Sequence, residues 1–85
     1  MTHYTTIDDK YYAKALTRGV AVVILRSTEK YNIGDNVIVS EYNTKGEYIT
    51  HNQLYTCIDS LYEVCERNKE KHYLCKLTVM NNSHH

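Results

Sequence analysis

The feature of this sequence that most constrains its fold is a change of hydrophobic period at Gly19. Before this glycine, Thr6–Arg18 repeats apolar residues at helical spacing, with Thr6 as the expected N-cap and acidic residues in the first turn. After it, Val20–Arg26 is rich in β-branched residues and is typical of a central strand. Glycine is the usual residue just beyond a helix C-terminus. The expected buried stripe of this helix consists of Ile7, Tyr11, Tyr12, Ala15 and Leu16.

The rest of the chain predicts strands joined by short turns. Asn32–Asp35 and Asn43–Gly46 have the composition of turns, and the second would close a hairpin. Leu54–Val64 fits either one long bent strand or two short strands, with a bulge at Asp59 and Ser60. The remaining expected strands are Asn36–Tyr42, Glu47–Thr50 and His72–Met80. One helix followed by about five strands predicts an α+β fold, a small and partly closed antiparallel β-barrel with the N-terminal helix packed against it.

Length and composition limit the chain to one domain. Its 85 residues provide for a single core, and a hydrophobic content of 42% argues against global disorder. We expect the domain to span residues 1–80 and the polar residues 81–85 to form a disordered tail. The sequence leaves open whether His84 and His85 are native or a tag remnant. The longest apolar run, Val20–Leu25, is too short to cross a bilayer, so we expect no membrane association and a cytoplasmic location.

The three cysteines, Cys57, Cys65 and Cys75, include no closely spaced pair. An odd number of cysteines without a Cys-x-x-Cys motif is typical of free thiols in a reducing compartment rather than of a disulfide framework. Together with His72, these cysteines are too far apart in the sequence for the ligand spacing of a zinc site. We therefore expect no metal and no other cofactor.

Charge is balanced in total, with ten Lys and Arg against ten Asp and Glu, which argues against a nucleic-acid coat protein. It is uneven along the chain, because residues 10–30 hold five basic side chains and one acidic, whereas residues 31–66 hold six acidic and one basic. Lys10, Lys14 and Arg18 recur every four residues and form either an anion-binding patch or an ordinary solvated helix face. The acidic segment would repel a long phosphate backbone, so we expect any nucleic-acid contact to be short or end-on.

Arg26 and several tyrosines are the other candidate ligand-binding residues. Arg26 ends a wholly apolar run, where a buried charge needs a partner. Its guanidinium suits a phosphate, a carboxylate or a base edge, and equally a structural ion pair with Glu41 or Asp35. The chain has nine Tyr and no Phe or Trp, which gives more hydroxyls than a small core easily satisfies. Rings near the predicted turns, Tyr31 and Tyr42 among them, either stack on a base or pack across strands.

Several residues occur in an order that resembles a known group of proteins. They are Tyr12–Leu16, Gly19, Arg26, Tyr31–Val39, Glu41–Tyr42 and Gly46–Tyr48. They give a helix that ends in glycine, a strand that ends in arginine, a Gly-Asp turn before an alternating strand, and a Gly-Glu-Tyr hairpin. From about Asp9 to Met80 the chain is similar to the ASCH domains of the PUA-like superfamily, in particular to a short branch common in phages and bacteria. The resemblance implies a small β-barrel that binds RNA.

Some ASCH proteins hydrolyse the acyl group of an acetylated cytidine, and their characteristic stretch is Gly-x-Lys-x-x-Glu-x-Arg. In this chain Gly19 and Arg26 match, but the lysine position is Ala21 and the glutamate position is Ile24. Alkyl side chains transfer no protons, and positioned acid–base groups contribute roughly 10²–10⁴-fold each to a rate. Chance Cys–His and Ser–His combinations are common in a chain with five His. We therefore expect no enzyme activity.

The leading hypothesis is a non-catalytic ASCH/PUA-like domain that binds RNA or a nucleotide-like ligand in a cleft beside the N-terminal helix. The expected ligand-binding residues are Arg26, Lys30, Arg18, Lys14, Tyr31 and Tyr42. One alternative is a phage-type accessory protein that binds and modulates a host protein, which would place it in the host cytoplasm. The other is a divergent amidohydrolase that acts on an acetylated nucleoside. A monomer or a weak dimer is expected in each case.

Overall fold

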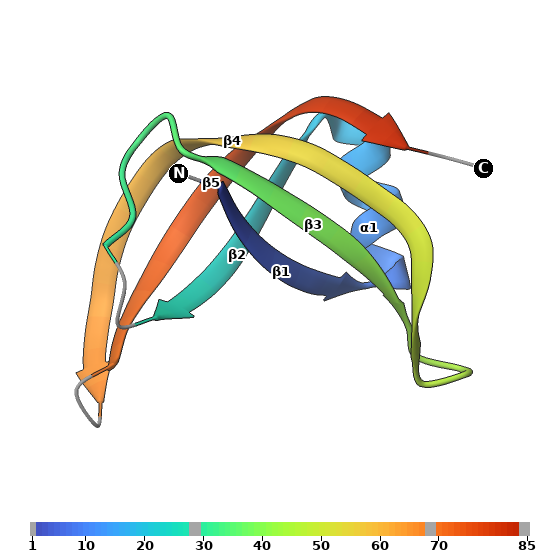
Figure 1. Ribbon diagram of the computed structural model, residues 1–85, viewed down its shortest axis with the longest axis horizontal. Helices are drawn as coiled ribbons and strands as arrows, with labels where there is room; N and C mark the ends of the chain where they lie inside the picture. The colour runs from blue at the N-terminus through green and yellow to red at the C-terminus, as the bar shows by residue number, and fades with distance from the viewer. Residues whose placement is uncertain (1, 28–29, 68–69, 84–85) are drawn as a thin grey trace.

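The computed structural model of the protein describes residues 2–27, 30–67 and 70–83. In these ranges the chain forms five strands and one helix, as expected for a strand-rich α+β fold (Figure 1). No helix in this part of the chain is long and apolar enough to span a membrane. The elements are β1 (Thr2–Asp8), α1 (Asp9–Arg18), β2 (Val20–Ser27), β3 (Asn36–Asn43), β4 (Tyr48–Arg67) and β5 (Glu70–Ser83).

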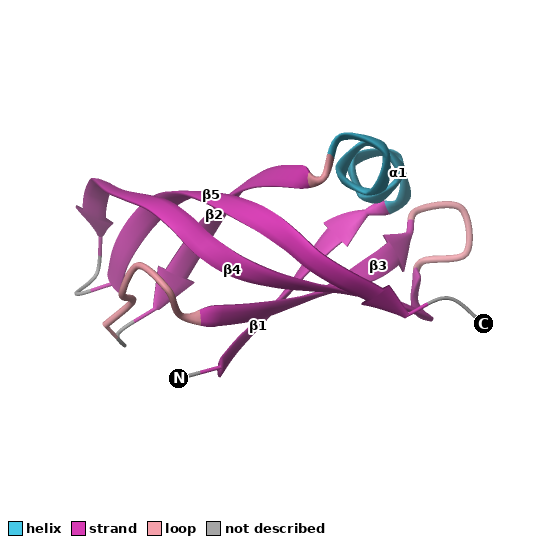
Figure 2. Cartoon of the chain, turned by 90° about the horizontal axis from the view of Figure 1, so that it is seen from above, coloured by secondary structure: helices cyan, strands magenta, loops and turns pink. Residues whose placement is uncertain are grey.

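All five strands belong to one mixed sheet in the order β1-β3-β4-β5-β2. β1 runs parallel to β3, whereas the other neighbouring strands are antiparallel, so the prediction of a wholly antiparallel sheet is wrong at this edge. β1 and β2 are the two outer strands, and no backbone pairing joins them among the described residues. The sheet therefore arches without closing into a barrel, and α1 lies at one end of it (Figures 1 and 2).

The helix is shorter than predicted because β1 occupies the residues before it. Asp8, not Thr6, is the N-cap, and its Oδ1 accepts the backbone N–H of Tyr11 at 3.0 Å. The C-terminal prediction is confirmed, since Gly19 has φ 75° and donates its N–H to the carbonyl of Ala15 at 2.8 Å. A left-handed residue at this point turns the chain directly from α1 into β2.

β1 has no counterpart in the sequence-based prediction. Its inward positions are His3, Thr5 and Ile7, of which only His3 is buried in this strand. Threonine and tyrosine favour strands, but most residues on both faces of β1 are polar, so the sequence shows no alternation of apolar and polar residues. Pairing with β3 is therefore what makes this segment a strand.

β4 and β5 form a long hairpin that gives the sheet its curvature. β4 is one strand of 20 residues, and its register with β5 shifts at three points, one of them at the predicted bulge between Ile58 and Ser60. Bulges increase the local bend and twist of a strand. β5 continues to Ser83, so residues 81–83 pair with 53–55 instead of forming the expected disordered tail. His84 and His85 lie outside the described residues.

β2 is an edge strand rather than the central strand that its composition predicts. It pairs with β5 alone, from Val20 opposite Thr78 to Ser27 opposite Lys71. Alternate residues face the core (Ala21, Val23 and Leu25), whereas the others are exposed (Val20, Val22, Ile24 and Arg26). A fully apolar run suggested burial on both faces, but only one face of β2 is covered.

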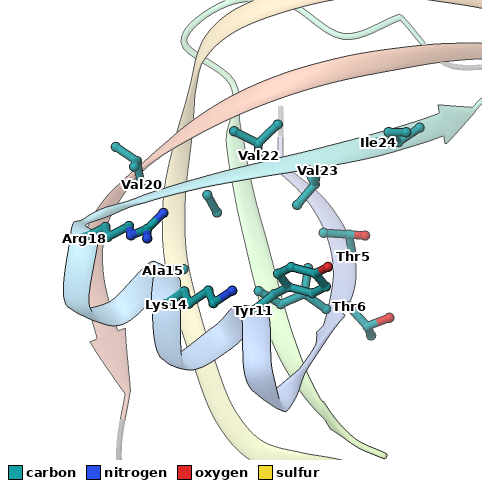
Figure 3. A pocket seen from close by; sticks show the side chains of 12 residues that line it. Thr5, Thr6, Tyr11, Lys14, Ala15, Arg18, Val20, Val22, Val23 and Ile24 are labelled. Carbon is teal, nitrogen blue, oxygen red and sulfur yellow. The ribbon is translucent and has the colours of Figure 1, made fainter.

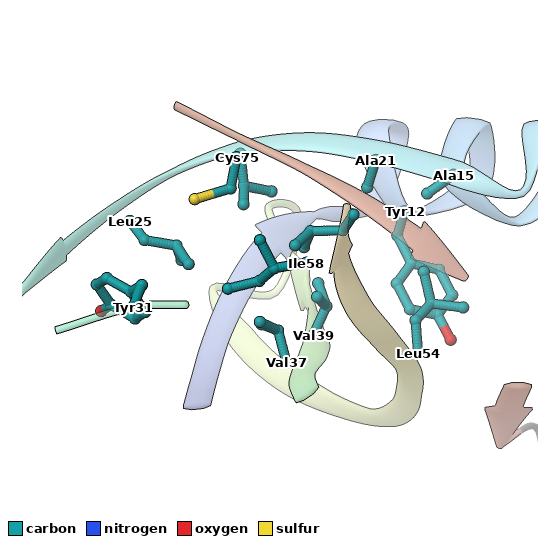
Figure 4. Packing of buried hydrophobic residues seen from close by; sticks show 12 residues of the cluster. Tyr12, Ala15, Ala21, Leu25, Tyr31, Val37, Val39, Leu54, Ile58 and Cys75 are labelled. Atoms are coloured by element: carbon teal, nitrogen blue, oxygen red, sulfur yellow. The ribbon is translucent and has the colours of Figure 1, made fainter. Parts of the chain in front are cut away.

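The core fills the concave side of the sheet and is shown in Figure 4. α1 contributes Tyr12 and Ala15 to it, as predicted, but the predicted Tyr11 is exposed. Burial raises the pKa of the Tyr12 hydroxyl, to which the charge of Glu41 adds, and burial also raises the pKa of the Cys75 thiol. The strands, and the loop between β2 and β3, contribute Ala21, Val23, Leu25, Tyr31, Val37, Val39, Leu54, Ile58, Cys75 and Leu77.

The predicted turn at residues 32–35 is confirmed and ties β1 to the rest of the sheet. Gly34 has φ 95°, and Asp35 Oδ2 accepts the backbone N–H of Asn32 at 3.1 Å. The same carboxylate oxygen lies 2.9 Å from Nε2 of the buried His3. These hydrogen bonds, first that of His3 and then that of Asn32, hold the pKa of Asp35 below its usual value.

The shifted pKa of Asp35 predicts a specific loss of stability in acid. A carboxylate whose pKa is lower in the folded than in the unfolded state stabilises the fold at neutral pH, and this contribution disappears as the pH falls below about 4. We expect Asp35→Asn to lower the free energy of unfolding at pH 7 and to flatten its decline in acid, as measured by urea denaturation. Asp59→Asn, which removes an exposed carboxylate 3.7 Å from Lys76, is the matched control. Equal acid sensitivity of Asp35→Asn and the unsubstituted protein would contradict the role of this hydrogen bond.

Candidate functional site

A groove of about 410 Å³ lies where the two unpaired sheet edges approach the helix (Figure 3). This volume is within the range of small-molecule binding sites, roughly 300–1,000 Å³. β1 lines it through Thr5–Ile7 and β2 through Val20–Ile24, whereas α1 contributes four side chains. They are Tyr11, Lys14, Ala15 and Arg18.

The helix supplies the charged and aromatic side chains of the groove. Tyr11, Lys14 and Arg18 are three and four residues apart, a spacing that places them on one face of a helix. In Figure 3 they extend from α1 on the side that faces β2. Lys14 Nζ lies 5.5 Å from the centroid of the exposed Tyr11 ring, within the range of a cation–π contact. Lys10, the third basic residue of the predicted helix face, is not part of the lining.

β2 lines the groove with backbone as well as with side chains. Successive residues of a strand point to opposite faces, so five consecutive lining residues, Val20–Ile24, show that the strand edge itself borders the groove. An outer strand leaves backbone N–H and C=O groups without a strand partner along that edge. The groove thus combines two cations, an aromatic ring and a row of backbone donors and acceptors.

Ala21 and Ile24, the two positions that the expected resemblance to ASCH domains assigns to lysine and glutamate, both border this groove. Ala21 is buried and faces the core, whereas Ile24 is exposed on the other face of β2. The described lining contains hydroxyl, ammonium, guanidinium and alkyl groups, and it contains no carboxylate, imidazole or thiol. In the described part of the chain, no three His, Cys, Asp or Glu side chains cluster closely enough to hold a metal ion.

Two of the six predicted ligand-binding residues, Lys14 and Arg18, line the groove, and the other four do not. Arg26 is exposed on the outer face of β2, two residues beyond Ile24, so the prediction of a buried charge there is wrong. Neither proposed ion-pair partner holds it. Asp35 contacts His3, and Glu41 Oε1 accepts hydrogen bonds from Thr50 at 2.9 Å and Asn52 at 3.2 Å.

Tyr31 and Tyr42, the two tyrosines predicted to bind a ligand, lie outside the groove. Tyr31 is 9% exposed, and its ring centroid lies 4.3 Å from that of His3 and 5.4 Å from that of Tyr73. It is therefore a core residue and not an open platform for a base. Tyr42 is half-buried on β3 opposite Ile49, and the exposed Lys30 precedes Tyr31 outside the groove. The aromatic residue that does line the groove is Tyr11, which the helical period assigned to the core.

A second surface feature lies on the outer face of β2, β5 and β4. Here Ile24 is opposite Leu74, which is opposite Tyr62, and all three are exposed. With the exposed Val22 they form what we name the outer apolar face. Arg26, His72 and Cys65 make the neighbouring cross-strand row. Arg26 thus belongs to this face.

The different surroundings of Tyr31 and Tyr11 predict that removing Tyr31 lowers the free energy of unfolding far more than removing Tyr11. Tyr31→Ala empties a buried aromatic site, so we expect it to lower the free energy of unfolding by about 3–5 kcal/mol. Tyr11→Ala removes a ring that is 61% exposed, and we expect a change within about 0.5 kcal/mol. Urea denaturation of both variants measures the difference. A stable Tyr31→Ala protein would contradict the assignment of that ring to the core.

Comparison with known proteins adds no relative to this description. No protein-family model matches the chain, and no curated protein matches it.

Proposed function

We propose that this protein is a non-catalytic domain of the ASCH/PUA-like type that binds a short RNA or a nucleotide-like ligand in the groove beside α1. The observation that carries the proposal is the pair Lys14 and Arg18 on one wall of the groove, next to the exposed ring of Tyr11. The predicted site is thereby revised, because Arg26, Lys30, Tyr31 and Tyr42 are not among the lining residues.

Among the described residues, no negative charge competes with a ligand for the two cations of the groove. Within the described residues, neither Lys14 nor Arg18 has a carboxylate partner, and no carboxylate lines the groove. Guanidinium and ammonium groups together suit a phosphate, since arginine offers a planar fork and lysine a mobile point charge. The patch is small, which favours a mononucleotide or the end of a strand over a long duplex.

The apolar part of the groove suits a base. Tyr11 of α1 and the alkyl side chains of β2 that line the groove offer a flat and an aliphatic surface. Stacking of a base on an aromatic side chain contributes about 1–3 kcal/mol in single-strand binders. The free edge of β2 adds backbone hydrogen-bonding groups to the groove.

The composition of the lining supports binding without catalysis. Hydrolysis of an acetylated nucleoside requires a base or nucleophile and a group that protonates the leaving nitrogen. Ala21 and Ile24 provide neither, and the described lining contains no carboxylate, imidazole or thiol. The amidohydrolase alternative therefore finds no support in the groove.

Titration of a fluorescent short single-stranded RNA tests the proposal. We expect Lys14→Ala and Arg18→Ala each to weaken binding and to lower the slope of log affinity against log salt by about 1. Lys10→Ala removes the same charge from the same helix outside the groove and serves as the matched control. Arg26→Ala is expected to leave the affinity unchanged. An equal loss for Lys10→Ala and Lys14→Ala would indicate diffuse electrostatic attraction instead of a groove.

A protein partner is the second candidate, and the outer apolar face favours it. Val22, Ile24, Tyr62 and Leu74 expose adjacent apolar side chains, flanked by the basic residues Arg26 and Lys76. Exposed apolar surface of this kind marks interaction sites in soluble domains. A partner for it would present an apolar surface with acidic groups at its rim. RNA binding that is lost in Lys14→Ala argues against this candidate as the main function, whereas failure of RNA to bind favours it.

A further inference from the structure

We propose that Cys65 is a nucleophilic thiol that exchanges with low-molecular-weight disulfides, with His72 as the acceptor of its proton. The site lies near the β4–β5 hairpin end and shares no residue with the groove, so the proposal does not depend on the proposed function. No local sequence pattern marks this pair, because Cys65 and His72 lie on different strands.

The two side chains face each other across the hairpin. Cys65 Sγ lies 3.3 Å from His72 Nδ1, within hydrogen-bond reach for sulfur. The cysteine is exposed and the histidine is half-buried. A base within hydrogen-bond reach of a thiol is the arrangement that generates the reactive thiolate, and exposure gives a small disulfide access to it.

A β-bulge creates this contact. The β4–β5 register runs regularly through Tyr62 opposite Leu74 and Glu63 opposite Tyr73, and then shifts so that Cys65 is opposite His72. In an unshifted register Val64 would be opposite His72, and Cys65 would be opposite Lys71 and point to the other face of the sheet. The bulge therefore turns the thiol towards the imidazole.

The other two cysteines provide an internal comparison. The Cys57 thiol faces the carbonyl of Ile58 at 3.9 Å, and the Cys75 thiol faces the carbonyl of Tyr73 at 3.8 Å. A carbonyl oxygen accepts a hydrogen bond from the protonated thiol but cannot take the proton. Cys75 is in addition fully buried, and Cys57 is half-buried. Cys65 alone among the three combines exposure with a proton acceptor in the described structure.

The charged groups around the pair are of both signs. Arg26 of β2 is opposite His72 on the same face, where its positive charge favours a thiolate. Glu66 and Lys71 are opposite each other on the next row, which points to the other face. Lys71 Nζ also lies 3.6 Å from Glu63 Oε1, so this pair largely compensates itself. Glu70 lies two residues before His72 on β5 and therefore on the same face, so one basic and one acidic side chain flank the Cys65–His72 row.

The exchange step is balanced without any further reactant. The Cys65 S–H proton moves to His72, and the thiolate attacks one sulfur of the incoming disulfide. The old S–S bond breaks as the new one forms, and the leaving thiolate takes up a proton. Cys65 is oxidised to a mixed disulfide, and half of the reagent is reduced to a free thiol. Glutathione disulfide represents the reagent class in a reducing compartment.

Reaction of the native protein with glutathione disulfide, followed by mass spectrometry, tests the proposal. We expect one fast addition at Cys65, absent in Cys65→Ser and retained in Cys57→Ser. His72→Gln should slow this addition about threefold at pH 7, because the gain in thiolate is partly offset by its lower nucleophilicity. The difference should shrink in alkaline solution, where hydroxide takes the thiol proton without the help of His72.

The pH dependence separates a proton acceptor from a structural role. If His72→Gln loosened the fold, the buried Cys75 would react faster at every pH. Mass spectrometry of the Cys75 thiol detects this. Equal rates for Cys57 and Cys65, or an unchanged rate at pH 7 in His72→Gln, would overturn the proposal.

Discussion

The unpaired edges of β1 and β2 are the constraint on which the rest of the structure depends. The long β4–β5 hairpin bends at its bulges, so the sheet arches, yet the edge strands do not pair among the described residues. α1 connects these strands in the chain and packs Tyr12 and Ala15 into the core below them. The groove exists because backbone and side chains that a closed barrel would bury remain open there.

The chemistry of the groove follows from the way the helix is fixed. Asp8 caps its start and Gly19 ends it, and the burial of Tyr12 and Ala15 sets the rotation of α1 about its axis. With Tyr12 and Ala15 facing inward, residues 11, 14 and 18 must face β2. Two cations are thereby held beside an aromatic ring and an uncharged strand edge. The proposed nucleotide ligand combines an anion with a flat apolar part, which corresponds to these two kinds of side chain.

Local signals were predictable from the sequence, whereas features set by register were not. The helix end at Gly19, the turn at Asp35 and the bulge near Asp59 each depend on a few neighbouring residues. β1 was not predicted because its inward residues are mostly polar. β2 was predicted as a central strand because most of its exposed positions are also apolar. Arg26 and Tyr31 were misplaced for the same reason, since their faces are decided by pairing with distant strands. The contact of Cys65 with His72 depends on a one-residue shift that no local pattern reveals.

The most direct test of the open-edge account is a residue-resolved NMR titration of the protein with a short single-stranded RNA. We expect the amide signals of residues 5–7, of α1 and of residues 20–24 to move when RNA binds. The amides on the free edge of β2 should become protected from hydrogen exchange. Signals of Tyr62 and Leu74, on the outer apolar face, should stay in place. Shifts confined to the β4 and β5 residues of that face, or no shift at the two strand edges at saturating RNA, would contradict the proposed groove.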